Sequence, residues 1–178
     1  MKIRSTTIIG LIHRGHAAMA GDGQVTLDET VLKTRAVKIR TMHDGKILAG
    51  FAGAAADALA LYELLEKRID EYSGNLQRAA VELAKEWRTD KTLQRLEAII
   101  AVTDNKSIYM ISGTGDIVEP DDKIIAIGSG GSFALAAARG LLAGNKKWSA
   151  ERIARTAMEI AADICIYTNN EITVRTIR

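Results

Sequence analysis

Segments that favour strands and segments that favour helices occur in blocks along this chain, and their order limits the fold. Short runs rich in isoleucine, valine and threonine favour strands, whereas apolar residues spaced three or four apart favour helices. The expected order is three strands (6–12, 16–20, 46–51), two helices (58–72, 76–87), three strands (96–102, 107–111, 123–127), two helices (133–142, 150–164) and a closing strand (171–177). A doubly wound parallel sheet would require strict alternation of strands and helices. We therefore expect an α+β protein, a four-layer αββα sandwich of two antiparallel sheets flanked by helix pairs.

Three of the expected helix ends carry residues with strong end preferences. Gly74 suits the left-handed position that ends the first helix, and Asn75 can then cap the second. Ser149 can cap the fourth helix in the same way. The first two helices are therefore expected to be joined by a tight turn.

Composition places the chain among ordinary globular proteins. A length of 178 residues suits one domain, and the net charge of +2 gives no reason to expect nucleic acid or a membrane surface as partner. The longest apolar stretch, 47–65, contains Asp57 and Glu63 and does not resemble a membrane span. The single cysteine, Cys165, allows no internal disulfide, which fits a reducing cytoplasm.

Several familiar kinds of catalytic or binding site lack their residues. The three histidines, His13, His16 and His43, form no HExxH motif. His13 and His16 are expected to flank a surface turn, because Arg14-Gly15 suits a hairpin turn between the first two strands. No GxSxG motif supplies a serine nucleophile. The cluster Gly128-Ser129-Gly130-Gly131 lacks the third glycine of a dinucleotide fingerprint, because position 133 is phenylalanine. The cluster is either a tight turn into a helix or a support for another site.

The stretch STTIIG, residues 5–10, leaves two interpretations open. Its threonines are good strand formers and can simply begin a strand. Alternatively, a threonine exposed as the first residue can attack a carbonyl group, with its own α-amine acting as the base. A free α-amine has a pKa of roughly 7.7 to 8.0, and a nearby lysine ammonium would lower it. The residues alone do not decide between the two.

Longer runs of sequence add a family resemblance. These runs are TTIIGLIHRGHAAMAGDGQVTL, LAGFAG, NLQRAAVELAKEWRTDK, LEAIIAV, ISGTGDIVEPDD, AIGSGG and DICIYTN, in this order. Together they resemble the proteolytic subunits of bacterial HslUV (ClpYQ) proteases, relatives of proteasome β-subunits among the N-terminal nucleophile hydrolases. Only the first five and last few residues lack a counterpart. The resemblance implies a threonine endopeptidase with Thr6 as nucleophile, a pro-segment at 1–5 that is removed, and a single peptidase domain at 6–178. Cleavage before Ser5 is the alternative.

The resemblance also assigns the rest of the catalytic site. Lys38 matches the active-site lysine, although Lys33 is close enough in sequence to be confused with it. Asp22 matches the acid that pairs with that lysine, and Ser129 the serine that hydrogen-bonds near the amine. Gly50 matches the residue whose backbone N–H holds the oxyanion.

A cation site is implied near the C-terminus. Backbone carbonyls of residues that match Ala162, Cys165 and Thr168 bind a monovalent cation, such as sodium, in the family. Residues spaced by three near the end of a helix can present unpaired carbonyls at its negative end. Ala162 replaces a glycine that is common in the family, which a carbonyl ligand tolerates.

Partners follow from the same resemblance. The chain has no recognisable ATP site, and the family works with a hexameric AAA+ unfoldase, HslU, which threads unfolded proteins into a chamber. That chamber is a dodecamer of two stacked hexameric rings. Two alternatives remain: an inactive ring scaffold that keeps its pro-segment, and an amidase of the same fold that acts on a small molecule.

Overall fold

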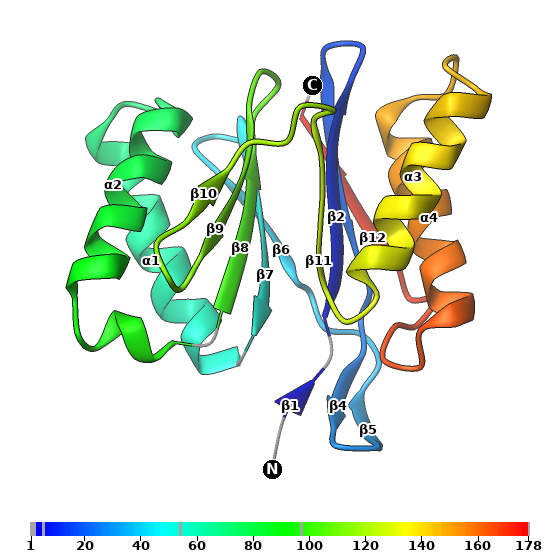
Figure 1. Cartoon of the computed structure of the whole chain (residues 1–178), viewed down its shortest axis with the longest axis horizontal. Coiled ribbons are helices and arrows are strands. Elements are labelled where there is room, and N and C mark those ends of the chain that lie inside the picture. Colours follow the sequence, from blue (N-terminus) through cyan, green and yellow to red (C-terminus); the bar gives the residue numbers. More distant parts are fainter. Residues whose placement is uncertain (1–2, 5, 54, 97, 178) are drawn as a thin grey trace.

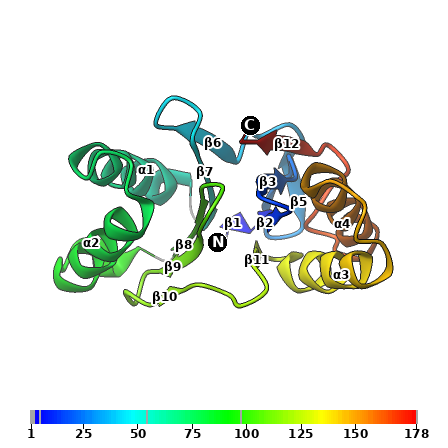
Figure 2. The ribbon, with the colours of Figure 1, turned by 90° about the horizontal axis from the view of Figure 1, so that it is seen from above.

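Two antiparallel sheets pack face to face in this protein, and a pair of helices covers the outer face of each sheet (Figure 1). The computed structural model describes residues 3–4, 6–53, 55–96 and 98–177. Viewed from above, the helix pairs lie on opposite sides of the two sheets (Figure 2). The expected four-layer αββα sandwich is confirmed.

The elements follow the expected block order. The strands are β1 (Ile3–Arg4), β2 (Thr7–His13), β3 (His16–Gly21), β4 (Val25–Leu27), β5 (Thr30–Lys33), β6 (Ile39–Met42), β7 (Ile47–Gly53), β8 (Ala98–Thr103), β9 (Ile108–Ser112), β10 (Ile117–Val118), β11 (Ile124–Gly128) and β12 (Thr173–Thr176). The helices are α1 (Ala55–Glu71), α2 (Leu76–Thr89), α3 (Gly131–Gly144) and α4 (Ala150–Ile164), with a 3-10 turn at Leu93–Arg95. The third helix thus begins two residues before its predicted start.

The two large sheets place the first strand of the sandwich at the centre of the molecule. One sheet has the order β10-β9-β8-β7-β6, and the other has the order β11-β2-β3-β12. Helices α1 and α2 cover the first sheet, and α3 and α4 cover the second. Both faces of β2 are buried: Ile8 packs between the sheets, whereas Ile9 and Leu11 pack under α3 and α4. Each such side chain contributes about 1.5–3 kcal/mol when fully buried.

The helix caps form as the sequence predicts. Gly74 has a φ of 80°, and its N–H donates to Ile69, which closes α1. The Asn75 side chain accepts a hydrogen bond of 3.1 Å from Arg78 N, and Ser149 accepts one of 3.2 Å from Arg152 N. Each cap satisfies a backbone donor that the first helical turn leaves without a partner.

A third, smaller sheet of order β1-β4-β5 was not predicted. It extends beyond the end of the sandwich at which β2 begins (Figure 1). Strand β4 has only three residues, and β5 is exposed along its whole length. Neither β4 nor β5 therefore shows the apolar alternation that identifies a half-buried strand in a sequence. Strand β1 pairs antiparallel with β4, with Ile3 opposite Leu27 and Arg4 opposite Thr26.

Membrane insertion has no support among the helices. Within the described ranges, no helix combines the length and the apolar character needed to cross a bilayer.

Candidate active site

The residues at the start of β2 are held by hydrogen bonds from two sides. The Thr6 carbonyl accepts a hydrogen bond of 2.9 Å from Ser129 N. The next amide, Thr7 N, donates to Asp22 Oδ1 at 2.8 Å, and Thr7 O accepts from Asp22 N at 3.2 Å. The peptide group that joins Thr6 to Thr7 is therefore fixed at both its oxygen and its nitrogen.

Asp22 is a buried carboxylate with three donors around it. It directly follows β3, whose last residue Gly21 pairs with Ile8 of β2, and this register brings Asp22 beside Thr7. Its side chain is inaccessible to solvent. Oδ1 accepts from Thr7 N and from Lys38 Nζ, the latter at 2.7 Å, and Oδ2 accepts from Gln24 N at 2.9 Å. Asp22, which the resemblance identified as the partner of the lysine, is thus the centre of a polar cluster.

Lys38 lies immediately before β6 and forms an ion pair with Asp22. Its side chain is only 8% exposed, and burial lowers the pKa of its ammonium group, although the Asp22 carboxylate opposes this shift. Lys33 lies in β5 and is exposed. Of these two lysines, Lys38 is therefore the one that pairs with Asp22.

The glycine cluster holds the start of β2. Ser129 N and Gly130 N donate to Thr6 O and to Thr7 Oγ1, the second at 2.8 Å. A Cβ atom on Gly128 would lie 1.7 Å from the Thr6 carbonyl oxygen, and Gly128 has a φ of 88°. Glycine is therefore required here for both close approach and backbone conformation. The cluster supports another site, which was one of the two interpretations of the sequence.

Gly50 is not part of this cluster. It lies within β7, between Ile39 of β6 and Ala101 of β8, and a Cβ on it would approach the Ile8 side chain at 2.8 Å in the core between the sheets. The glycine of β7 that lines a cavity together with Thr6 is Gly53, at the end of the strand and beyond the segment paired with β6. The family resemblance selected Gly50 from LAGFAG, and nothing in the local sequence pointed to Gly53 instead.

A cavity of 330 Å³ opens beside Thr6. Its walls are mainly apolar, and Lys38 and Gly53 lie on them with Thr6; the other lining residues are Val25, Ala36, Val37, Arg40, Phe51, Ala58, Leu59 and Tyr62. The Tyr62 hydroxyl donates to the Lys38 carbonyl at 3.0 Å, and the Arg40 guanidinium lies 4.7 Å from the centre of the Tyr62 ring. The cavity could hold an apolar side chain next to the Thr6 hydroxyl.

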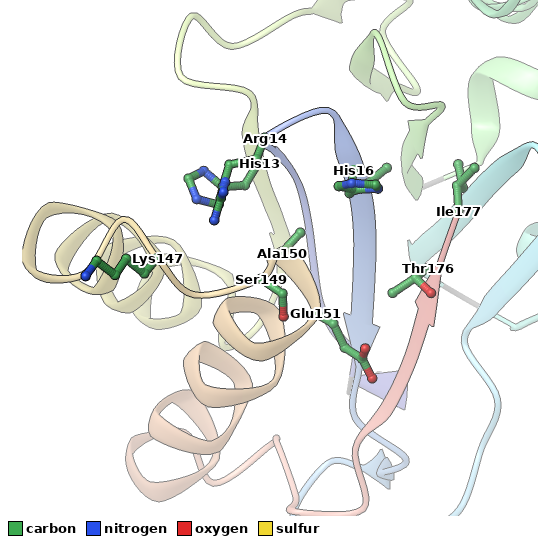
Figure 3. A pocket seen from close by; sticks show the side chains of 10 residues that line it. His13, Arg14, His16, Lys147, Ser149, Ala150, Glu151, Thr176 and Ile177 are labelled. Carbon is green, nitrogen blue, oxygen red and sulfur yellow. The ribbon is translucent and has the colours of Figure 1, made fainter.

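A second cavity, of 420 Å³, lies at the opposite end of β2 (Figure 3). His13 and His16 line it and flank the Arg14-Gly15 turn, as the sequence predicts. His13 Nε2 lies 3.0 Å from the Lys146 carbonyl oxygen. Across the described ranges, no three histidine, cysteine or acidic side chains are grouped so that they could hold a metal ion.

The predicted cation-binding residues surround the end of α4. Ala162 lies in the last turn of the helix, and Cys165 N donates to Ala161 O at 2.8 Å rather than to the Ala162 carbonyl. The Cys165 carbonyl accepts a hydrogen bond of 2.9 Å from Thr168 N, which leaves its second lone pair available. These carbonyls at the negative end of a helix are suitable donors for a small cation.

Sequence reasoning missed several residues that complete the site. Thr7 was considered only as a strand former, yet its hydroxyl is buried and contacts Thr168 Oγ1 at 2.6 Å. Asn169 accepts from Gly23 N at 3.0 Å and donates to Thr34 O at 2.9 Å, which ties the loop after α4 to the segment that contains Asp22. The threonine doublet was a visible signal for Thr7, and Asn169 ends the run DICIYTN, although no motif points to a role for its side chain.

A threonine beside a buried lysine–carboxylate pair, at the end of an αββα sandwich, defines the class of N-terminal nucleophile hydrolases. Comparison with known proteins agrees. The family model described as "Proteasome subunit" matches residues 3–177. The ATP-dependent protease subunit HslV of Oceanobacillus iheyensis is 51% identical over 175 residues, which is 98% of this chain and 97% of that protein.

Two further relatives agree in detail. The protein of the same name from a Geobacillus species is 55% identical over 176 residues, 97% of each chain. The crystal structure of eukaryotic HslV from Trypanosoma brucei superposes with a TM-score of 0.89 at 46% identity, covering 96% of this chain and 98% of that one. The chain belongs to the proteasome subunit family, on its HslV branch. It is accordingly a threonine-type peptidase, the proteolytic subunit of an ATP-dependent protease.

Proposed function

We propose that Thr6 becomes the nucleophile when residues 1–5 are removed and its amine is freed. The observation that carries this proposal is the position of the Asp22–Lys38 ion pair: Asp22 accepts a hydrogen bond from Thr7 N, and Lys38 lines the same cavity as Thr6. A threonine side chain needs a base, and in this arrangement the α-amine of Thr6 supplies one.

The reaction is hydrolysis of a peptide bond in two steps. Thr6 Oγ attacks the scissile carbonyl carbon while the Thr6 amine takes the hydroxyl proton, and the amine then returns this proton to the leaving nitrogen. The resulting ester on Thr6 is cleaved by water, activated by the same amine, which restores the free hydroxyl. The Lys38 ammonium, fixed by Asp22, lowers the pKa of the amine, so that a larger fraction is neutral at physiological pH.

We assign the oxyanion donor to the backbone at Gly53 rather than at Gly50. Gly53 lies on the cavity with Thr6, whereas Gly50 is enclosed between two strands in the core. A backbone donor of this kind contributes about 2.7–4 kcal/mol to the transition state.

The pro-segment at residues 1–5, the leader, indicates how an extended substrate would be held. Its residues Ile3 and Arg4 pair with Leu27 and Thr26 of β4 as an antiparallel strand. Once the leader is gone, that edge of β4 can pair with the backbone of a substrate. The neighbouring cavity would then take an apolar side chain from it, because Val25, Phe51 and Leu59 are among its walls.

Unfolded proteins are the proposed substrates, delivered by a hexameric HslU-type AAA+ ATPase to a chamber of two stacked hexameric rings. The relatives are named as subunits of an ATP-dependent protease, and this sequence contains no phosphate-binding motif of its own. Large apolar side chains are exposed on β5, before β6, on α1 and at the end of α4: Val31, Leu32, Val37, Leu59, Ile164 and Ile166. Subunit contacts would bury such side chains. The proposed location of the assembly is the cytoplasm, in keeping with the ATP-dependent proteases to which the relatives belong.

A monovalent cation, such as sodium, is proposed at the end of α4. The carbonyl oxygens of Ala162, Cys165 and Thr168 would hold it, in keeping with the preference of small hard cations for oxygen ligands. Its positive charge would stabilise the loop that joins α4 to β12.

Intact-mass analysis of the purified protein tests the proposal most directly. We expect active material to begin at Thr6 and to be labelled there by a reagent specific for N-terminal threonine. An intact leader on active protein would overturn the mechanism, and an intact leader on inactive, unlabelled rings would support the scaffold alternative. A chain that begins at Ser5, which is outside the described residues, would move the nucleophile by one position. Hydrolysis of small amides without protein degradation would support the amidase.

The pH dependence of the rate provides a prediction about Lys38. Because burial lowers the pKa of Lys38 below 10.5, the rate should fall on the alkaline side before that pH is reached, as the ammonium loses its proton. In the same window the unfolded chain holds more protons than the folded one, so stability should rise with pH while activity falls. The measurement is kcat/KM and the denaturation midpoint against pH. Lys33→Met should leave both profiles unchanged. If the rate of the wild-type protein does not fall between neutral pH and pH 10.5, the proposed role of Lys38 is wrong.

A further inference from the structure

The hydroxyl of Thr7 is buried in a contact that the proposed reaction does not use. Thr7 is completely inaccessible to solvent and Thr168 is 5% exposed, and their hydroxyl oxygens lie 2.6 Å apart. Gly130 N donates to the same Thr7 oxygen at 2.8 Å. A backbone N–H can only donate, so Thr7 Oγ1 accepts from Gly130 and shares one proton with Thr168.

This contact requires a glycine at position 130. A Cβ atom there would lie 2.6 Å from Thr168 Oγ1 and 2.7 Å from Thr7 Oγ1, closer than real carbon atoms approach such oxygens. Gly130, the second glycine of the cluster, therefore makes room for the hydroxyl pair. The pair is built into the packing of three segments that are far apart in the sequence.

These three segments converge on the residue that follows the nucleophile. They are the start of β2, the turn that precedes α3, and the loop between α4 and β12, which lies at the same end of the sandwich as β4 (Figure 1). The loop is itself anchored to the segment after Asp22, since Ile166 O accepts from Gln24 Nε2 at 2.9 Å. Thr7 is thus held at two points: its hydroxyl contacts Gly130 and Thr168, and its backbone N–H donates to Asp22.

We propose that Thr7 is a positioning residue for the Thr6 nucleophile, acting through its hydroxyl contacts with Gly130 and Thr168. The inference rests on the proposed role of Thr6. When the leader has been removed, Thr6 ends the chain, so that Thr7 becomes its covalent anchor. The Thr7 side chain fixes this anchor against rotation and sliding along β11. A misplacement of about 1 Å at a reacting group can cost on the order of a hundredfold in rate.

Isosteric variants separate the hydroxyl from the shape of the side chain. Thr7→Val keeps the volume and removes the hydroxyl, whereas Thr7→Ser keeps the hydroxyl. We expect Thr7→Val to lower kcat for a short peptide by about ten- to a hundredfold with KM changed by less than about twofold, and Thr7→Ser to recover activity to within about threefold. Thr168→Val should also lower kcat. The double variant Thr7→Val/Thr168→Val should have the same kcat as Thr7→Val alone, because each single change already removes the hydrogen bond between the two hydroxyls.

A matched control is a buried threonine away from the site. Thr103 is completely buried in β8, and its hydroxyl donates to the backbone of Asp104 and Ser107. Thr103→Val should lower the denaturation midpoint without changing kcat per subunit that begins at Thr6, as counted by intact mass. If Thr7→Val does not assemble, Thr7→Ser and Thr168→Val carry the test by the same measurements.

The proposal and the underlying function fail in different ways. Wild-type kcat in Thr7→Val or Thr168→Val, an equal loss in Thr7→Ser and Thr7→Val, or additive losses in the double variant would overturn the positioning role while Thr6 is still labelled. An absence of labelling at Thr6 in active wild-type protein would overturn the assignment of the nucleophile itself.

Discussion

Replacement of Thr6 by alanine is expected to abolish peptide hydrolysis while the chain still folds and assembles. The change removes the attacking oxygen but leaves the amine, the Asp22–Lys38 pair and the glycine cluster in place. Loss of the nucleophile in a serine hydrolase lowers kcat by about 10⁶-fold, and a loss on this scale would fall below detection here. The rate of hydrolysis is measured in two ways: by release of a fluorophore from short peptides, and by degradation of an unfolded protein with the ATPase present.

Two further variants make this result specific to the hydroxyl of Thr6. Thr6→Ser keeps a hydroxyl on a residue with a free amine and should retain measurable activity. Thr103→Ala removes a buried threonine from β8 and should lower stability without loss of rate per folded subunit. Hydrolysis at the wild-type rate by Thr6→Ala would require another nucleophile, and the mechanism would have to be abandoned.

Local sequence signals predicted the parts of the fold that depend on local physics. The two-residue turn at Arg14-Gly15, the caps at Asn75 and Ser149 and the apolar periodicity of the helices each act over a few residues, and all appear in the structure. The stretch from 25 to 42 gave no such signal. Its strands β4, β5 and β6 are only three or four residues long, and β5 is exposed along its whole length. They are held by pairing, β4 with β1 and β5, and β6 with β7, rather than by a long apolar pattern of their own.

The site shows the same division. The family resemblance proposed Asp22, Lys38 and Ser129, and the structure places all three around Thr6 and Thr7. It assigned the oxyanion donor to Gly50, whereas Gly53 is the glycine of β7 that lines the cavity beside Thr6, and this difference depends on which neighbours surround each glycine. The Thr7–Thr168 contact joins residues 161 positions apart, and no sequence spacing encodes such a contact.

In the proposed mechanism, one buried carboxylate serves both stability and catalysis. Asp22 neutralises a buried ammonium, fixes the amide that follows the nucleophile, and is itself held by Gln24 N. A change at this residue therefore has two separable consequences, one for folding and one for the rate.

Asp22→Asn is expected to lower both the rate and the free energy of unfolding. The amide leaves the Lys38 ammonium buried without its counter-charge, and breaking a buried ion pair in this way costs about 3–5 kcal/mol. The rate should fall by about a hundredfold or more, because Thr7 N loses a charged acceptor and Lys38 its fixed position. Chemical denaturation and peptide hydrolysis at the same pH measure the two effects.

The double variant Asp22→Asn/Lys38→Met separates these effects. Removal of the unpaired ammonium should restore much of the lost stability, because a buried pair can often be replaced by uncharged groups at little cost. The rate should stay low, because no cation is left to lower the pKa of the Thr6 amine. Glu171→Gln, which breaks the exposed pair with Arg35, is the matched control and should cost less than about 1 kcal/mol with no effect on rate. Recovery of both stability and rate in the double variant would show that the ion pair only holds the fold together and has no part in the reaction.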